Sequence, residues 1–281
     1  MDDSVGYIWT PGKLARQSVP SPRETILCIQ VNGQELVKLA VSPVQQEALV
    51  TGFLYHAGLI RDTSDIRVLR FHPDRPCADV WLNHNPDRLS RTPFLTSGCG
   101  GGIVLGDLYT PPVPLKSTLR LSPEALVAMM HALQMHMGLY RQSRGVHTSA
   151  LFAPDGEMLA LAEDIGRHNT IDKLLGLCLL QKIKSDDTLL LTTGRVSSEM
   201  LSKAALLRSP IIGSLTAFTT QARALAEMWH ITAVGYVRQQ RMTIYAHPER
   251  LASGLALEEP RGLDTHDHLP KEEHLADLVT A

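Results

Sequence analysis

The residue with the clearest chemical potential is Cys99, which lies in the run Thr96-Ser97-Gly98-Cys99-Gly100-Gly101-Gly102. Glycine tolerates positive φ and lets other groups approach the backbone closely, so this composition predicts a loop. A thiol that is reachable in a loop and can ionise serves as a nucleophile or a metal ligand. A tight turn with an incidental cysteine would account for one or two of these glycines but not for all four. We therefore interpret Cys99 as a functional thiol.

The other three cysteines have structural interpretations. Cys28 lies in a predicted strand and Cys178 on the apolar face of a predicted helix, so both are expected in the core. Cys77, beside Pro76, is given a structural or neutral role. The four cysteines form no Cys-x-x-Cys pair, which argues against a zinc ribbon and against dithiol redox chemistry.

Polar residues gather in three clusters that follow predicted strands. The clusters contain Gly166, Arg167, His168 and Asn169; Thr193, Gly194, Arg195, Ser197 and Ser198; and Ser214, Thr216, Thr219 and Thr220. Free backbone N–H groups and the helix dipole make the start of a helix suitable for an anion, and arginine can grip phosphate oxygens with two hydrogen bonds. The clusters therefore suit a phosphate-bearing ligand.

The alternative is that these residues cap helices and pair with Glu163, Asp164 and Glu199. For one cluster alone the two interpretations are balanced, and the occurrence of three favours the ligand. None of the clusters is a Walker loop or a dinucleotide fingerprint, so the spacing does not identify a nucleotide. A further group, Tyr236-Val237-Arg238-Gln239-Gln240-Arg241, places two cations and an aromatic ring at a turn, where an ordinary exposed hairpin is the alternative.

The first half of the chain predicts a small α+β lobe over residues 23–114, preceded by a flexible arm over residues 1–22. Asn32-Gly33 predicts a hairpin turn between strands 25–31 and 35–41, because both residues tolerate positive φ. Ser42-Pro43-Val44-Gln45 predicts a capping box at the start of a helix over 45–57. Strand, loop and strand are expected over 67–81. The spacer Thr110-Pro-Pro-Val-Pro114 predicts the boundary of this lobe.

The second half predicts an α/β lobe over residues 115–252 and a mobile tail over 253–281. Ser122 caps a helix that Gly138 ends, and a hairpin joins 147–152 to 158–162. Strands at 188–192, 211–215, 231–237 and 242–245 then alternate with helices that begin near 169, 198 and 222. This order predicts a mostly parallel sheet with an edge derived from a hairpin. Histidines 266, 268 and 274 are expected in a solvated tail and not at a metal.

The overall composition excludes some classes of protein. The 281 residues carry 27 Lys and Arg against 29 Asp and Glu, which is not the footprint of a nucleic-acid-binding protein. The chain starts with an acidic segment, without an apolar run typical of a signal peptide, and no stretch has the length of a membrane span. We expect a cytoplasmic, reducing location, in which free thiols persist.

Two segments carry a family resemblance: Glu163-Asp164-Ile165-Gly166-Arg167-His168-Asn169 with Asp172-Lys173-Leu174, and Thr193-Gly194-Arg195 through Ser198-Glu199-Met200 to Lys203-Ala204-Ala205. They resemble the formate dehydrogenase accessory sulfurtransferase family, FdhD. Segments 31–33, 52–60 and 235–250 add to the similarity, which spans roughly residues 24–252 in order. Both strand-to-helix motifs are specific, so chance agreement of the two is not expected.

The resemblance implies a cytidine-deaminase-like, three-layer C-terminal lobe with a mixed sheet, beside a smaller α+β N-terminal lobe. It implies a sulfurtransferase that accepts sulfur from a cysteine desulfurase as a persulfide on Cys99. The sulfur then passes to the bis(molybdopterin guanine dinucleotide) molybdenum cofactor, which formate dehydrogenase uses. The cofactor-contacting segment of the family falls on Tyr236 to Arg241, and GDP-like nucleotides would mimic part of this cargo. A homodimer is also implied.

This sequence departs from the family at Gly102, where many members have a second cysteine. A relay between two neighbouring thiols is therefore absent, although a single thiol suffices to carry a persulfide. The departure leaves open an alternative, a chaperone that carries the molybdenum cofactor without sulfur chemistry. A zinc deaminase is excluded, because His147-Thr148-Ser149 lacks the required glutamate and the chain has no Pro-Cys-x-x-Cys segment. No metal ligands of the protein itself are expected.

Overall fold

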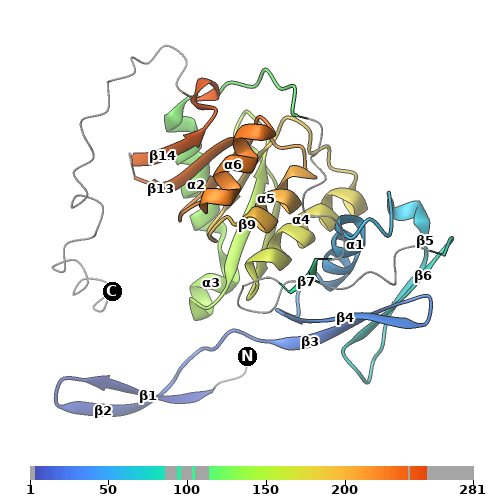
Figure 1. Cartoon of the computed structure of the whole chain (residues 1–281). Coiled ribbons are helices and arrows are strands. Elements are labelled where there is room, and N and C mark those ends of the chain that lie inside the picture. Colours follow the sequence, from blue (N-terminus) through green and yellow to red (C-terminus); the bar gives the residue numbers. More distant parts are fainter. Residues whose placement is uncertain (1–3, 86–93, 96–102, 105–113, 240, 252–281) are drawn as a thin grey trace.

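The computed structural model describes residues 4–85, 94–95, 103–104, 114–239 and 241–251 of the chain (Figure 1). Its architecture is mixed α/β, with a four-stranded sheet in the first half and a six-stranded sheet in the second. Two predicted site residues, Cys99 and Gln240, lie outside the described residues. The same holds for the predicted tail over 253–281.

The first element is a hairpin of β1 (Val5–Thr10) and β2 (Lys13–Ser18), which projects from the body of the molecule (Figure 1). Sequence patterns had assigned no strand to residues 1–22. The two strands pair antiparallel from Val5 with Ser18 to Thr10 with Lys13. Gly12, with φ of 78°, provides the positive φ of the turn. Nearly every residue of the hairpin is exposed, so its strands show no burial pattern by which the sequence would reveal them.

The N-terminal sheet has the order β4-β3-β6-β5. Its strands are β3 (Thr25–Val31), β4 (Gln34–Val41), β5 (Ile66–Phe71) and β6 (Cys77–Leu82). The Asn32-Gly33 turn is confirmed, with φ of 49° and 83°. Alternate residues such as Leu27, Ile29 and Val31 face the apolar side of α1 (Gln46–His56) and form the core of this half.

The predicted capping box at the start of α1 is wrong. The helix begins after Gln45, whose φ is 52° and whose side chain makes no capping bond. The polar atoms of Ser42 bond instead to the C-terminal half: its N–H donates to Asp164 Oδ2 at 3.0 Å, and its Oγ accepts from the Ile165 N–H at 3.1 Å. The Ser42 hydroxyl, which a capping box would use within its own helix, is therefore engaged in a contact between the two halves of the chain.

The C-terminal sheet has the order β10-β9-β11-β12-β13-β14. Its strands are β9 (His147–Phe152), β10 (Met158–Asp164), β11 (Leu189–Thr192), β12 (Ile211–Ser214), β13 (Thr232–Arg238) and β14 (Arg241–Ala246). Only the β11–β12 and β12–β13 pairs are parallel. The prediction of a mostly parallel sheet is therefore wrong. Hairpins occupy both edges and β9 also pairs antiparallel with β11, so the sheet is mixed.

Helices cover both faces of this sheet. The bounds are α2 (Pro123–His136), α3 (Gly138–Ser143), α4 (Arg167–Gln181), α5 (Ser198–Ala205) and α6 (Thr220–Met228). The methionine stripe of α2 packs on one face with Leu189 and Leu191, as expected for core residues. Helices α4, α5 and α6 pack on the other face around Leu190, and Cys178 lies in that core as predicted. Gly138 was predicted to end α2, but α2 ends at His136 and Gly138 begins α3, which the sequence pattern missed.

Four short elements complete the described chain. They are the single turns η1 (Thr63–Asp65) and η2 (Pro248–Arg250), and the antiparallel pair β7 (Phe94–Leu95) and β8 (Ile103–Val104). Among the residues listed above as described, no helix combines the length and the apolar character that crossing a membrane requires.

The two halves join where α1 crosses α4 (Figure 1). The helices touch through glycines: a Cβ added to Gly52 would lie 1.8 Å from the Asp172 carbonyl oxygen, and one added to Gly176 would lie 1.8 Å from the Ala48 oxygen. Backbones this close exclude any side chain at either position. The crossing therefore fixes how the N-terminal lobe sits against the helix that begins at the second lobe's predicted site.

Candidate functional site

The loops that follow β11, β12 and β13 meet at one end of the C-terminal sheet, where the carboxyl ends of these strands lie. This end is called the sheet edge below. The Leu215 N–H donates to the Thr192 carbonyl at 3.1 Å, and Ser214 Oγ donates to the Gly194 carbonyl at 2.8 Å. The Tyr236 N–H donates to the Thr216 carbonyl at 3.1 Å. The second and third polar clusters and the start of the Tyr236–Arg241 segment are thus brought together, as ligand-binding edges of such sheets require.

The first cluster joins this edge through Arg167, the first residue of α4. A Cβ added to Gly194 would lie 3.0 Å from Arg167 Cβ and 3.4 Å from His147 Nδ1, so the loop after β11 lies directly against both residues. His147 was not among the predicted site residues. Its position at the start of β9, opposite Asp164, was the available signal. Burial, with the nearby charges of Arg167 and His168, lowers the pKa of His147.

The loops at this edge are held by their own hydrogen bonds. The Thr148 N–H donates to Thr193 Oγ1 at 3.0 Å, and the Val196 N–H donates to the Ala217 carbonyl at 3.0 Å. Ser197 Oγ accepts from the Met200 N–H at the start of α5, so for Ser197 the capping interpretation is confirmed. The Ser198 carbonyl accepts from Ser202 Oγ. These loops form a preorganised edge with half-buried hydroxyl groups.

Apart from Arg167, which is buried, the arginine side chains at the edge face solvent. Arg195, Arg238 and Arg241 are exposed, and so are Gln239 and the ring of Tyr236, which is 47% exposed. Val237, between them, is buried and packs in the core. Tyr236 and Gln239 have φ of 51° and 48°, a conformation that a residue with a side chain adopts rarely and most often at functional sites. The bend presents Tyr236 and Arg238 outward while Val237 anchors the strand.

A buried network of charged and polar groups lies behind the edge, between the two lobes. Lys173 Nζ lies 2.6 Å from Asp164 Oδ2, and both side chains are fully buried. Asp164 also accepts from the Gly166 N–H and from Asn169 Nδ2, each at 2.8 Å. Because Asn169 donates in addition to the Ala40 carbonyl at 2.9 Å, both of its N–H groups are engaged within the protein. Of the first cluster, Asn169 thus fastens α4 to the N-terminal lobe.

A second part of the network connects α4 to α5. Lys203 Nζ lies 2.6 Å from Asp172 Oδ2, and His168 Nε2 lies 3.1 Å from Glu199 Oε2. All four side chains are buried. Burial raises the pKa of Asp172, against the opposing charge of Lys203. Of the three acids named in the capping alternative, Asp164 is therefore bound by a lysine and Glu199 by a histidine. Glu163 instead accepts from two N–H groups at the start of α3 and from a threonine hydroxyl. The sequence signal for the buried pairs was a run of charges inside apolar helix faces.

His56, at the end of α1, contributes a pH dependence to this network. Burial, with the charges of Lys203 and His168, lowers the pKa of His56 well below its ordinary value of 6.5. The folded protein therefore keeps His56 neutral at a pH where the unfolded chain already binds a proton. The contribution of His56 to the free energy of unfolding is fully present above about pH 6.5. It is lost as the pH drops, by at most ~1.4 kcal/mol per pH unit for one group.

We predict that His56→Gln loses less free energy of unfolding than the wild type when the pH is lowered from 7 to 5. Urea titrations at a series of pH values measure this difference. His131→Gln, at an exposed position of α2, is the matched control and should follow the wild type. Equal slopes for the wild type and His56→Gln would contradict the assignment. Part of the slope should remain in His56→Gln, because the pKa of His147 is lowered too.

Comparison with known proteins places the chain in a family. Residues 22–252 match the model of the FdhD/NarQ family. The chain is 36% identical over 258 residues to the Sulfur carrier protein FdhD of Bacillus subtilis (strain 168), covering 88% of this chain and 97% of that protein. It is 33% identical over 218 residues to the protein of the same name from Picrophilus torridus, covering 75% of this chain and 82% of the relative.

A solved structure agrees with this assignment. The crystal structure of a protein from Desulfotalea psychrophila, assigned as a formate dehydrogenase accessory protein, matches with a TM-score of 0.74 and 26% identity. The match covers 88% of this chain and 98% of that structure. The two strand-to-helix motifs that suggested the resemblance build the sheet edge described above, and the similarity extends over nearly the whole chain. The protein therefore belongs to the FdhD/NarQ family.

Proposed function

We propose that this protein is a sulfur carrier in the maturation of a formate dehydrogenase. It takes sulfur from a cysteine desulfurase as a persulfide on Cys99 and delivers it to the molybdenum cofactor of the client enzyme, acting in the cytoplasm as a homodimer. The observation that carries the proposal is the 36% identity over 258 residues with a protein named Sulfur carrier protein FdhD. The name of the Desulfotalea psychrophila protein supports the choice of client.

The first step of the proposed reaction is an exchange at sulfur. The Cys99 thiolate attacks the outer sulfur of the donor's persulfide and forms a new S–S bond. The donor's own S–S bond breaks, and its electron pair leaves with the donor cysteine as a thiolate. One neutral sulfur atom changes carrier, so the step needs no external oxidant or reductant.

The remaining thiols support Cys99 as the carrier. Cys28, Cys77 and Cys178 are free and buried. Burial raises the pKa of Cys28 to about 12, with the neighbouring Cys77 adding to the shift, and burial raises the pKa of Cys178 to about 11. Thiolates and not thiols attack sulfur, so Cys28 and Cys178 are unsuited to the exchange at neutral pH, and Cys77 is withdrawn from it by burial. Of the four cysteines in the sequence, this leaves Cys99.

The sheet edge supports binding of the cargo, bis(molybdopterin guanine dinucleotide). Its phosphate groups suit the hydroxyl-rich loops at Thr193 and Thr216 and the exposed arginines Arg195, Arg238 and Arg241. The exposed ring of Tyr236 offers a face on which a guanine base can stack. GDP is therefore the simplest probe of this edge.

The second candidate function is a chaperone that carries the cofactor without sulfur chemistry. It is favoured by Gly102, which stands where many family members have a second cysteine beside the first. The two candidates share the sheet edge and differ only at Cys99. They therefore predict the same binding of GDP and different behaviour of the thiol.

Intact-mass spectrometry after incubation with a cysteine desulfurase and cysteine tests the proposal. We expect an added mass of about 32 Da, one sulfur atom, that maps to Cys99 and is absent from Cys99→Ala. Cys178→Ala is the matched control and should accept sulfur like the wild type, since its thiol is buried. GDP binding by Cys99→Ala should be unchanged.

The outcomes separate the candidates. An adduct on Cys99 supports the sulfur carrier. Normal GDP binding with no adduct at Cys99 would support the chaperone and sink the persulfide proposal. Failure of the wild-type protein to bind either GDP or a guanine-containing dinucleotide would count against both.

A further inference from the structure

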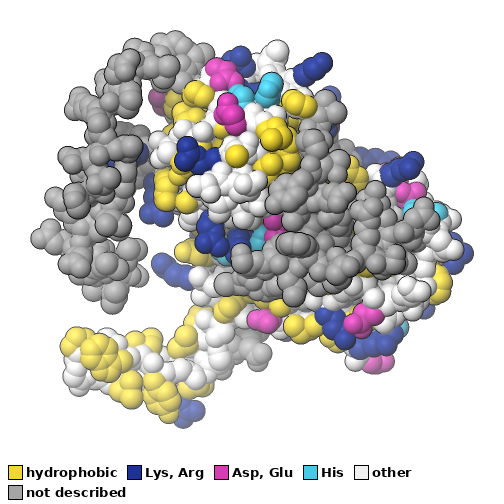
Figure 2. Space-filling model, viewed as in Figure 1, with side chains coloured by type: hydrophobic (Ala, Val, Ile, Leu, Met, Phe, Trp, Pro, Cys, Tyr) yellow, Lys and Arg dark blue, Asp and Glu magenta, His cyan; other side chains and the backbone are white. Residues whose placement is uncertain are grey.

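The hairpin β1–β2 exposes more apolar surface than a solitary ribbon can sustain. Trp9 is 70% exposed and Tyr7 67%, and Val5, Ile8 and Leu14 are also exposed. Figure 2 shows hydrophobic side chains along this hairpin, away from the body. Two-stranded hairpins are at best marginally stable alone in water, and contiguous exposed apolar surface marks an interaction site. The arm, defined here as residues 4–19, therefore needs a covering surface.

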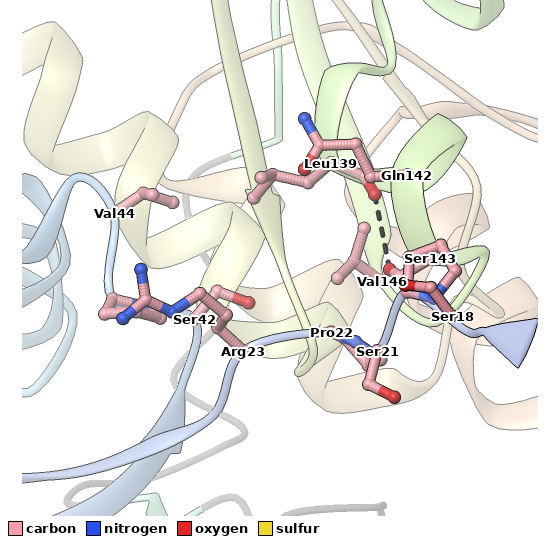
Figure 3. A pocket seen from close by; sticks show the side chains of 12 residues that line it. Ser18, Ser21, Pro22, Arg23, Ser42, Val44, Leu139, Gln142, Ser143 and Val146 are labelled. Atoms are coloured by element: carbon pink, nitrogen blue, oxygen red, sulfur yellow. Dashed lines mark hydrogen bonds between the residues drawn. The ribbon is translucent and has the colours of Figure 1, made fainter. Parts of the chain in front are cut away.

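The chain carries an apolar hollow of about 440 Å³ at the base of the arm. Its walls come from three places: Pro20 and Pro22 after β2, Val44 before α1, and Leu139 and Val146 around α3. Figure 3 shows Val44 and Arg23 at one end and Ser143 and Ser18 at the other, with Leu139 and Val146 between them. The exposed Arg23 adds a cation to the wall, and cations bind the face of an indole ring.

The arm and the hollow of one molecule suit each other but are held apart. Val5 pairs with Ser18 at the base of the arm, and Ser18 itself lines the hollow. Trp9 lies four residues further along the strand, roughly 14 Å away at ~3.4 Å per residue. The pairing from Val5 to Thr10 keeps the arm extended, so Trp9 does not reach its own hollow.

We propose that Trp9 inserts into the hollow of a second copy of this chain, and that the second copy's Trp9 inserts into the first. A two-fold axis between two arms that run in opposite directions places the tip of each arm near the base of the other. The same two surfaces then serve both copies, as in an isologous interface. This contact would form the interface of the homodimer proposed above, on which the proposal rests. It is independent of the sulfur chemistry.

The size of the two surfaces fits this arrangement. An aromatic side chain buries roughly 150–250 Å², and a stable interface buries about 800 Å² per partner. Two aromatic and three aliphatic side chains on the arm supply on the order of half of that area, and the hollow with its rim supplies the remainder. Tryptophans that fill a central pocket are also enriched among the residues that carry most of the binding energy of an interface.

Sedimentation equilibrium of the full chain, with dimer dissociation constants as the readout, tests the proposal. Trp9→Ala removes the inserted ring, and Val44→Glu places a charge in the hollow. Each should weaken the dimer at least ~100-fold, because every dimer loses the contact twice. The matched controls, Trp81→Ala and Val68→Glu, change residues that are 41% and 42% exposed on the N-terminal sheet and should leave the dimer unchanged.

Mixing the two weakened variants gives the sharpest result. A heterodimer of Trp9→Ala with Val44→Glu retains one intact contact, a native Trp9 in a native hollow, whereas neither homodimer retains any. We expect the mixture to form more dimer than either variant alone, which two misfolded proteins would not do. Dimers unaffected by Trp9→Ala, or no gain on mixing, would overturn the arm contact while leaving the homodimer standing. A monomeric wild type would overturn both.

Discussion

Gly176→Ala is expected to lose at least ~4 kcal/mol of folding stability, more than a typical alanine substitution changes. The added Cβ would lie 1.8 Å from the Ala48 carbonyl oxygen and 2.6 Å from its carbon. These are backbone atoms of α1, so no side chain can rotate away, and the two helices must separate. Separation would open the packed interface between the N-terminal sheet and the C-terminal lobe.

Urea unfolding measures this loss, and Gly52→Ala provides a second test from the other helix. Its Cβ would lie 1.8 Å from the Asp172 oxygen. Gly138→Ala is the matched control, because the nearest atom to its Cβ is Glu163 Oε2 at 3.4 Å, an ordinary contact. We expect that control to remain within about 1 kcal/mol of the wild type. A comparably small loss for Gly176→Ala would mean that the helices do not cross this closely.

Lys203→Met is expected to lose ~3–5 kcal/mol of folding stability, the usual cost of removing one partner from a buried ion pair. The Lys203 ammonium lies 2.6 Å from Asp172 Oδ2, and the two side chains are 2% and 1% exposed. It also lies 5.9 Å from the centre of the Phe53 ring of α1. Without it, the Asp172 carboxylate would be left buried in the lobe interface without its cation.

The double variant Lys203→Met/Asp172→Leu distinguishes a charge effect from lost packing. Because it removes both charges, it should be more stable than Lys203→Met alone. Lys184→Met, at an exposed position, is the control and should change the stability by less than about 0.5 kcal/mol. If the losses in Lys203→Met and in the single variant Asp172→Leu simply add in the double variant, the pair is not coupled. Urea unfolding at neutral pH measures the wild type and these four variants.

The sequence predicted those parts of the fold that depend on local chemistry. The Asn32-Gly33 turn, the Ser122 cap and the core positions of Cys178 and the α2 methionines are all confirmed. Each depends on a backbone preference or on the spacing of apolar residues within one element. Most strands were placed within a few residues for the same reason.

Features set by contacts between distant segments could not be predicted in this way. Ser42 has the local sequence pattern of a helix cap. It bonds instead to Asp164, which is distant in the sequence and close in the fold. The close approach at Gly52 and Gly176 leaves no periodic signal, because a glycine in a helix has several explanations. At the candidate site the sequence located the loops correctly, but it could not show that Asn169 is engaged within the protein or that His147 joins the edge.

Helix α4 has a consequence for how the chain can be divided. Its first residue, Arg167, lies at the sheet edge, its middle holds Asp172 and Lys173 in the buried network, and Gly176 touches α1. One helix therefore packs in the core of the C-terminal half and also holds the N-terminal half through α1. The lobes should unfold together in a single cooperative transition, and a fragment ending near the Pro-rich spacer at residues 110–114 would lack the surface against which its own helix folds.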